Sequence, residues 1–85
     1  MAVEVQIGTV SDFFARPVVA GIVLEDELKV GDRIRIEGHT SHMEFVIESM
    51  QIDGKNVQEA KPGDNVGIKV PDRVRRGDRV VKVSE

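Results

Sequence analysis

The sequence has no cysteine, tryptophan or tyrosine, and three phenylalanines supply its whole aromatic content, 4% of 85 residues. The lack of thiols excludes disulfides, thiolate zinc sites and cysteine nucleophiles together. Because aromatic side chains are so few, Val, Ile and Leu must form the core, and these residues favour strands. We therefore expect an all-β fold that depends on aliphatic packing and turns, in a reducing compartment.

Long hydrophobic runs are also missing, since none approaches the ~20 residues that span a bilayer. Residues 1–4 lack the basic and apolar regions of a secretory signal, so we expect a cytoplasmic protein without membrane contact. A chain of 85 residues has room for one hydrophobic core. Residues 1–85 are accordingly predicted to form a single domain.

Catalytic motifs are absent as well. The sequence contains no phosphate-binding G-x-x-x-x-G-K-[ST], no G-x-S-x-G and no H-E-x-x-H, so we expect neither catalysis nor a cofactor. His39, His42 and Glu44 are the one group that suggests a metal. A His-x-x-His spacing in a loop is far more often two solvated residues, and no metal site is predicted.

Almost every apolar segment alternates with polar residues at a period of two, the pattern of a half-buried strand. The expected inward sets are Val3, Val5 and Ile7, then Ile34 and Ile36, then Val66, Ile68 and Val70. The apolar set changes parity between Ile47 and Met50, and again beside Gly8. A β-bulge at each place would keep the core face inward and bend the sheet. Six strands with short loops then predict a small, closed or nearly closed six-stranded β-barrel.

The dipeptide Gly-Asp directly precedes a strand three times, at residues 31–32, 63–64 and 77–78. Glycine adopts a positive φ without penalty, and aspartate accepts hydrogen bonds from nearby backbone amides. We predict that one tight turn is used at all three places. The unequal spacing of the three pairs argues against a repeat architecture.

Basic residues concentrate near the C-terminus. Residues 73–82 carry five of them against one acid, a net charge of +4, so the remainder carries −7 against the total of −3. The five are Arg73, Arg75, Arg76, Arg79 and Lys82. One interpretation is a solvated segment whose charges face the protein's own acids. The other is a contact to RNA phosphates, with Phe13 as a stacking surface.

Residues 17–24 are apolar on both faces, which indicates a strand that is central or covered by a loop or by another molecule. Val18, Ile22 and Val23 are therefore candidates for contact with a partner protein. An exposed apolar edge at this strand would also allow pairing with a second copy of the chain.

Three segments together resemble domain two of elongation factor Tu and related translational GTPases: residues 18–23, 28–32 and 63–67. Residues 10–14, 48–52, 59–64 and 74–78 more closely resemble the short C-terminal barrel of collagenase-like peptidases and its stand-alone relatives. The resemblance implies a translation-factor domain-two barrel, with Asp64 and Asn65 in the pocket that holds the aminoacylated end of tRNA. The acidic pair near the first strand of that pocket is replaced by Gly8-Thr9, and its Arg and Glu in the second strand by Ile22 and Leu24.

The resemblance and the residues together predict a non-catalytic accessory module that binds RNA or a ribosome-associated protein. The alternative is a protein-interaction subunit that pairs, through residues 17–24, with a peptidase-like or GTPase-like partner chain. Steep salt dependence of binding favours the first hypothesis, and weak salt dependence favours the second.

Overall fold

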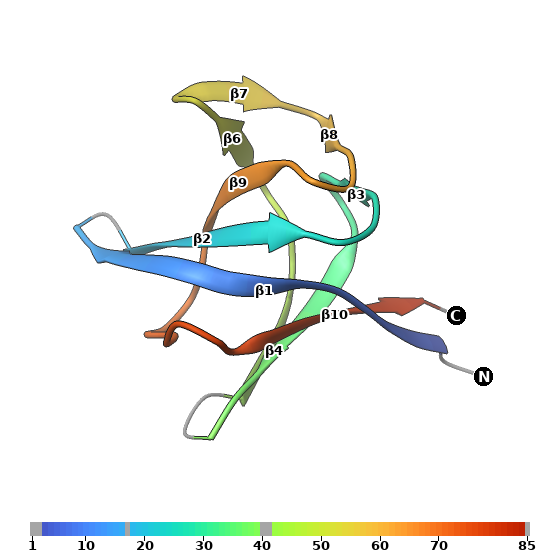
Figure 1. Ribbon diagram of the computed structural model, residues 1–85, viewed down its shortest axis with the longest axis vertical. Helices are drawn as coiled ribbons and strands as arrows, with labels where there is room; N and C mark the ends of the chain where they lie inside the picture. Colours follow the sequence, from blue (N-terminus) through green and yellow to red (C-terminus); the bar gives the residue numbers. More distant parts are fainter. Residues whose placement is uncertain (1–2, 17, 40–41, 85) are drawn as a thin grey trace.

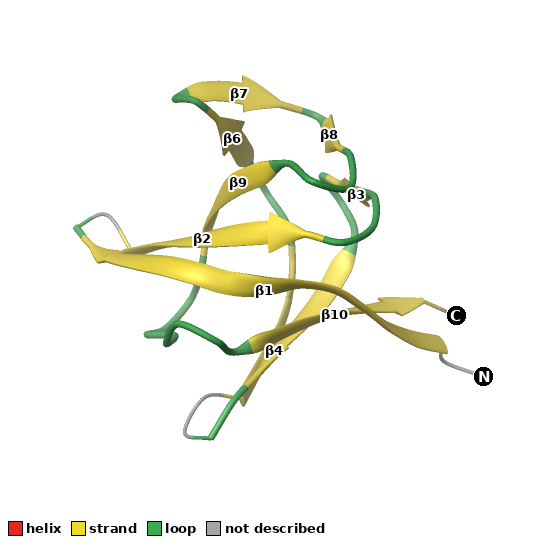
Figure 2. Ribbon diagram, viewed as in Figure 1, coloured by secondary structure: helices red, strands yellow, loops and turns green. Residues whose placement is uncertain are grey.

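The computed structural model describes residues 3–16, 18–39 and 42–84, which form strands joined by turns and loops (Figures 1 and 2). The strands are β1 (Val3–Ala15), β2 (Val18–Leu24), β3 (Leu28–Lys29), β4 (Arg33–Glu37), β5 (His42–Val46), β6 (Met50–Ile52), β7 (Lys55–Val57), β8 (Glu59–Ala60), β9 (Asn65–Lys69) and β10 (Arg79–Ser84). Eight of them form one antiparallel sheet in the order β5-β4-β10-β1-β2-β9-β6-β7, and β3 pairs with β8. The all-β prediction is confirmed, and the count of six strands is wrong.

Of the predicted closed or nearly closed barrel, closure by hydrogen bonds is wrong. Within the described residues the large sheet begins at β5 and ends at β7, and no backbone ladder joins these two strands. The apolar residues on the two sides of the parity change between Ile47 and Met50 lie on different strands, because β5 pairs with β4 whereas β6 pairs with β9 and β7. Between them, the buried Ile47 exchanges backbone hydrogen bonds of 2.9 Å with Gly31 and Asp32. The parity change at this point therefore marks a crossing of the chain and not a bulge.

The bulge predicted beside Gly8 is confirmed. The register of β1 against β10 shifts between Gln6 and Gly8, and a second shift against β2 follows between Val10 and Asp12. A β-carbon on Gly8 would lie 2.6 Å from the carbonyl oxygen of Val23, so only glycine allows this close approach of β1 and β2. The irregularities bend β1 around the core, as bulges commonly do.

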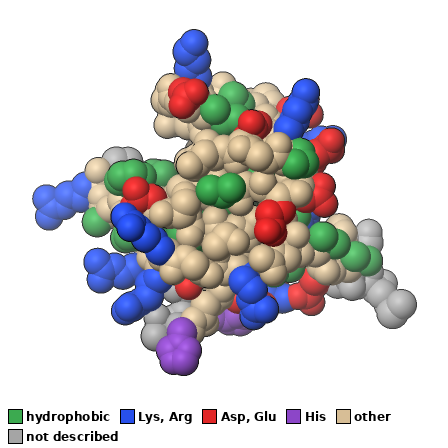
Figure 3. Space-filling view, in the orientation of Figure 1, with side chains coloured by type: hydrophobic (Ala, Val, Ile, Leu, Met, Phe, Trp, Pro, Cys, Tyr) green, Lys and Arg blue, Asp and Glu red, His purple; other side chains and the backbone are tan. Residues whose placement is uncertain are grey.

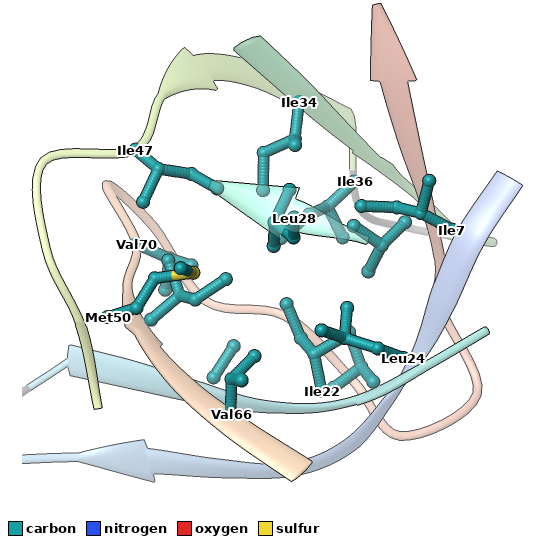
Figure 4. Packing of buried hydrophobic residues seen from close by; sticks show 14 of the residues in the cluster. Ile7, Ile22, Leu24, Leu28, Ile34, Ile36, Ile47, Met50, Val66 and Val70 are labelled. Atoms are coloured by element: carbon teal, nitrogen blue, oxygen red, sulfur yellow. The ribbon is translucent and has the colours of Figure 1, made fainter. Parts of the chain in front are cut away.

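The core is aliphatic and lies inside the curved sheet (Figure 4). Its fully buried side chains include Ile7, Ile22, Leu24, Leu28, Ile34, Ile36, Ile47, Met50 and Ile68. Val3 and Val5, which were expected inside, are instead 53% and 45% exposed. Their strand continues past the end of the core as a ribbon with β10, where nothing described covers the inward face.

The three Gly-Asp turns have the same geometry. Gly31, Gly63 and Gly77 have φ values of 98°, 91° and 90°, which few residues other than glycine adopt. In each turn the aspartate carboxylate accepts a hydrogen bond of 2.9 Å from the backbone N–H three residues before it. The prediction of one turn used three times is confirmed.

Candidate binding site

A pocket of about 400 Å³ lies on the outer face of the sheet, open to solvent. It is bounded by the β1–β2 hairpin on one side and the β6–β7 hairpin on the other. Its lining residues are Phe14, Arg16, Val19, Gly21, Gln51, Asp53, Gly54, Asn65, Val66 and Gly67. Volumes of this order are usual for sites that hold a small molecule or one residue of a polymer.

Two glycines form the floor of the pocket. Gly21 on β2 and Gly67 on β9 are directly paired across the ladder, so adjacent strands present bare backbone at the same level. Gln51 on β6 lies opposite Gly67 on the other side of β9. A β-carbon on Gly21 would make only ordinary contacts, 3.4 Å from Ser11 and Asp12. Glycine inside a strand is typical of places where another group comes close to the backbone.

The wall on the β1–β2 side carries the aromatic group of the site. Phe14 lies opposite Val19 on the outer face and is 52% exposed, whereas Phe13 lies opposite Ala20 and packs against the core. Successive residues of a strand point to opposite faces, so only one of the two phenylalanines can reach solvent freely. Phe13 was the predicted stacking residue, whereas the exposed ring is that of Phe14. Choosing between the two requires the register of β1 against β2, which pairs Phe13 with the inward-facing Ala20 and Phe14 with Val19.

The wall on the β6–β7 side is a tight turn. Asp53 and Gly54 both have positive φ values, 52° and 77°, as the two-residue Asp-Gly hairpin turn requires. Gln51 donates a hydrogen bond of 3.1 Å to the side-chain oxygen of Asn56 across the hairpin. This wall therefore offers amide and carboxylate groups on a tight turn.

Of the two pocket residues implied by resemblance, the structure brings one to this site. Asn65 lines the pocket. Asp64 instead serves the turn before β9, where its carboxylate accepts the N–H of Lys61 at 2.9 Å and its carbonyl accepts that of Leu24 at 2.9 Å. The side chain of Asp64 is thus committed to backbone geometry.

The basic loop, residues 73–78 before β10, lies beside the β1–β2 hairpin that bounds one side of the pocket. Hydrogen bonds of 2.9 Å join the N–H of Gly77 to the carbonyl of Val10, and the N–H of Val10 to the carbonyl of Asp78. Arg73 lies over the ring of Phe13, 5.8 Å from its centre, and Arg76 is 3.6 Å from the carboxylate of Asp12. Lys and Arg side chains gather on this side of the molecule, at the left of Figure 3.

The remaining basic residues are less concentrated than the sequence suggested. Arg75 is exposed in the loop. On β10, Arg79 is 3.7 Å from Glu37, and Lys82 is 3.4 Å from Asp32. These pairs, in which Arg79 is exposed and Lys82 is half-buried, agree with the interpretation that part of the segment faces the protein's own acids.

The predicted interface strand is central and not an edge. β2 is hydrogen-bonded to β1 on one side and to β9 on the other, so it cannot accept a further strand from a partner or a second copy. Ile22 is fully buried, Val18 is half-buried and Val23 is 41% exposed. Ile22 therefore belongs to the core and offers no surface. Pro17 lies outside the described residues.

Among the residues that the structure describes, the histidines do not form part of a metal-ligating group. His42 and Glu44 are exposed on β5, and Glu44 lies 3.2 Å from Arg33 and 3.7 Å from Arg35. In the part of the chain that the structure describes, no three side chains of His, Asp or Glu gather closely enough to hold a metal ion. No helix in that part is long and apolar enough to cross a membrane.

The chain is similar in sequence to part of a protease and to part of an elongation factor. No protein-family model matches the chain. An uncharacterized protease of Methanocaldococcus jannaschii is 45% identical over 83 residues, 96% of this chain and 20% of that protein. Elongation factor Tu 2 of Streptomyces avermitilis is 41% identical over 64 residues, 71% of this chain and 16% of that protein. The chain thus spans a fifth or less of the length of these relatives.

Among solved structures, the C-terminal domain of a U32 peptidase from Geobacillus thermoleovorans superposes with a TM-score of 0.85. The superposition covers 91% of this chain and 90% of that domain, at 20% sequence identity, which shows a shared fold. The predicted resemblance to the elongation factor Tu domain-two barrel and to the C-terminal barrel of peptidases is confirmed.

Proposed function

We propose that this chain, a relative of elongation factor Tu and of the C-terminal domain of a peptidase, is a non-catalytic accessory module that binds single-stranded RNA. The observation that carries the proposal is the exposed ring of Phe14 beside a floor of paired glycines. A nucleobase can stack on an exposed aromatic ring whatever the RNA sequence is. The two glycines, which carry no side chain, let the base approach the sheet closely.

The polar groups of the pocket suit a base as well. Gln51 and Asn65 each carry an amide that can both donate and accept hydrogen bonds, the combination needed to meet the edge of a nucleobase. Arg16 adds a cation at the mouth of the pocket. The pocket thus combines a stacking surface, amides, the positive charge of Arg16 and the carboxylate of Asp53 within about 400 Å³.

The basic loop supplies a place for the phosphates of the same strand. Phe13 and Phe14 point to opposite faces of β1, so the loop that covers Phe13 and the pocket beside Phe14 lie on two sides of one hairpin. An RNA strand that stacks one base on Phe14 could pass its phosphate backbone over Arg75 and Arg76. The likeness to an elongation factor favours RNA of the translation apparatus as the ligand.

Fluorescence anisotropy of a labelled ten-nucleotide RNA, titrated with the chain at several salt concentrations, tests this proposal. Because stacking contributes about 1–3 kcal/mol per base, we expect Phe14→Ala to weaken binding by roughly fivefold to 150-fold. Asn65→Ala should weaken it less, and Arg75→Glu with Arg76→Glu should also reduce the salt dependence. The control is Val46→Ala, which removes a side chain that is 44% exposed outside the pocket. Equal affinity of Phe14→Ala and Val46→Ala would refute the proposal.

A second candidate function is that of a subunit that pairs with a peptidase-like chain. It is favoured by the match of almost the whole chain to one fifth of a protease, and by the shared fold with a peptidase C-terminal domain. Affinity purification from lysate at low and high salt separates the two functions. A peptidase-like protein retained at both salt concentrations supports the second function, and RNA that is lost steeply as salt rises supports the first.

A further inference from the structure

An apolar strip is left uncovered where β1 extends beyond the core. Val3 and Val5 are 53% and 45% exposed, although they continue the inward set that ends at the fully buried Ile7. They lie opposite Ser84 and Lys82 on β10. Lys82, on the same face, has its ammonium group 3.4 Å from Asp32, so its charge is already paired. The strip therefore presents two neighbouring valines on the inner face of the sheet.

The same part of β1 has an unpaired backbone edge. β2 pairs with β1 only from Gly8 onward, so within the described residues no strand lies beside residues 3–6 on the side away from β10. This end of the ribbon, where Val3 pairs with Ser84, projects from the rest of the molecule (Figure 1). Hydrophobic side chains are exposed at the same end in Figure 3. Apolar side chains next to a free strand edge are typical of a protein interaction surface.

We propose that this strip, consisting of Val3, Val5 and the free edge of residues 3–6, is the surface that docks on the body of a peptidase-like chain. The inference rests on the second candidate function. The solved domain with the same fold is the C-terminal domain of its protein, so the rest of that protein precedes the fold in sequence. In this chain the first strand begins at Val3, beside the uncovered valines. The peptidase-like body covers the valines with apolar side chains and pairs with the free edge.

A chimaera tests the proposal with the complete chain. The 83-residue segment of the Methanocaldococcus jannaschii protease that matches this chain is replaced by residues 1–85, and hydrogen exchange is compared between the chimaera and the free chain. We expect the amides of residues 3–7 to exchange about tenfold more slowly, or slower still, in the chimaera. Val3→Lys with Val5→Lys should abolish the slowing, and Val46→Lys, at a valine of similar exposure on β5, should preserve it.

The possible outcomes separate the docking surface from the function on which it rests. If hydrogen exchange slows only in other parts of the chain, the strip is not the docking surface, but the pairing with a peptidase-like chain stands. If exchange slows nowhere, both the docking surface and the pairing are overturned. A photo-reactive benzoylphenylalanine at position 3 gives a second measurement that needs no charged residue in the ribbon. Cross-links from it to the protease body support the proposal, and cross-links only within residues 1–85 overturn it.

Discussion

Replacing Asp78 by alanine should destabilise the fold more than the same change at Asp32 or Asp64, although the three residues occupy equivalent turns. In each turn the carboxylate accepts a backbone N–H at 2.9 Å. The surroundings differ, because Asp78 is only 6% exposed and its bond is partly buried, whereas the other two bonds are exposed. Water can replace the lost acceptor at Asp32 and Asp64 but reaches the site of Asp78 poorly.

The expected difference follows from this burial. A buried N–H left without a partner costs about 1–3 kcal/mol, whereas loss of an exposed hydrogen bond costs about 0.5–1.5 kcal/mol. The carboxylate of Asp78 also packs directly against Gly38 and leaves no room for a β-carbon on that glycine. Alanine at position 78 therefore leaves a void there. For a chain of this size, each 1 kcal/mol lowers the melting temperature by about 4–8 °C.

Urea unfolding of the three alanine variants and of the matching asparagine variants measures the effect. Asparagine keeps a side-chain oxygen that can accept the same N–H, so Asp78→Asn should recover part of the stability lost in Asp78→Ala. Asp32→Ala also removes the half-buried ion pair with Lys82, so its loss of stability is compared with that of Asp64→Ala, which has no such pair among the described residues. Equal losses at all three positions, or no recovery by asparagine at position 78, would show that the burial of this turn has no energetic consequence.

Five further substitutions, in three sets, test the packing. Gly8→Ala should lower the free energy of unfolding by about 1–3 kcal/mol in urea, because the added carbon meets the Val23 carbonyl at 2.6 Å, and a change below about 0.5 kcal/mol would contradict the close approach. Phe13→Ala should cost about 2 kcal/mol or more while Phe14→Ala changes stability by less than about 0.5 kcal/mol, and the reverse order would contradict their assigned faces. Ile22→Lys should prevent cooperative unfolding, as judged by circular dichroism, whereas Val23→Lys should preserve it.

The features predicted correctly from the sequence are those that depend on neighbouring residues. Alternation identified Ile34, Ile36, Val66 and Ile68 as inward-facing, because the strand period of two is a local property of the backbone. The Gly-Asp turns were predicted for the same reason, since the glycine and the aspartate satisfy the turn within four residues.

The candidate site was predicted only in part. Asn65 followed from the resemblance, and the basic loop followed from composition. Phe14 and the pairing of Gly21 with Gly67 could not be predicted, because each depends on the register between strands distant in sequence. A shift of one residue in that register would exchange the roles of Phe13 and Phe14.

Composition and local pattern by themselves determined that the chain is all-β, aliphatic in its core and built on a repeated turn. The tertiary structure decided which strands are neighbours: that β2 is central, that β5 and β6 lie far apart in the sheet, and that β1 extends past the core with its valines exposed. The physical reason is that alternation specifies which way a side chain points relative to its own strand. Whether anything covers that face depends on hydrogen bonds to strands far away in the sequence.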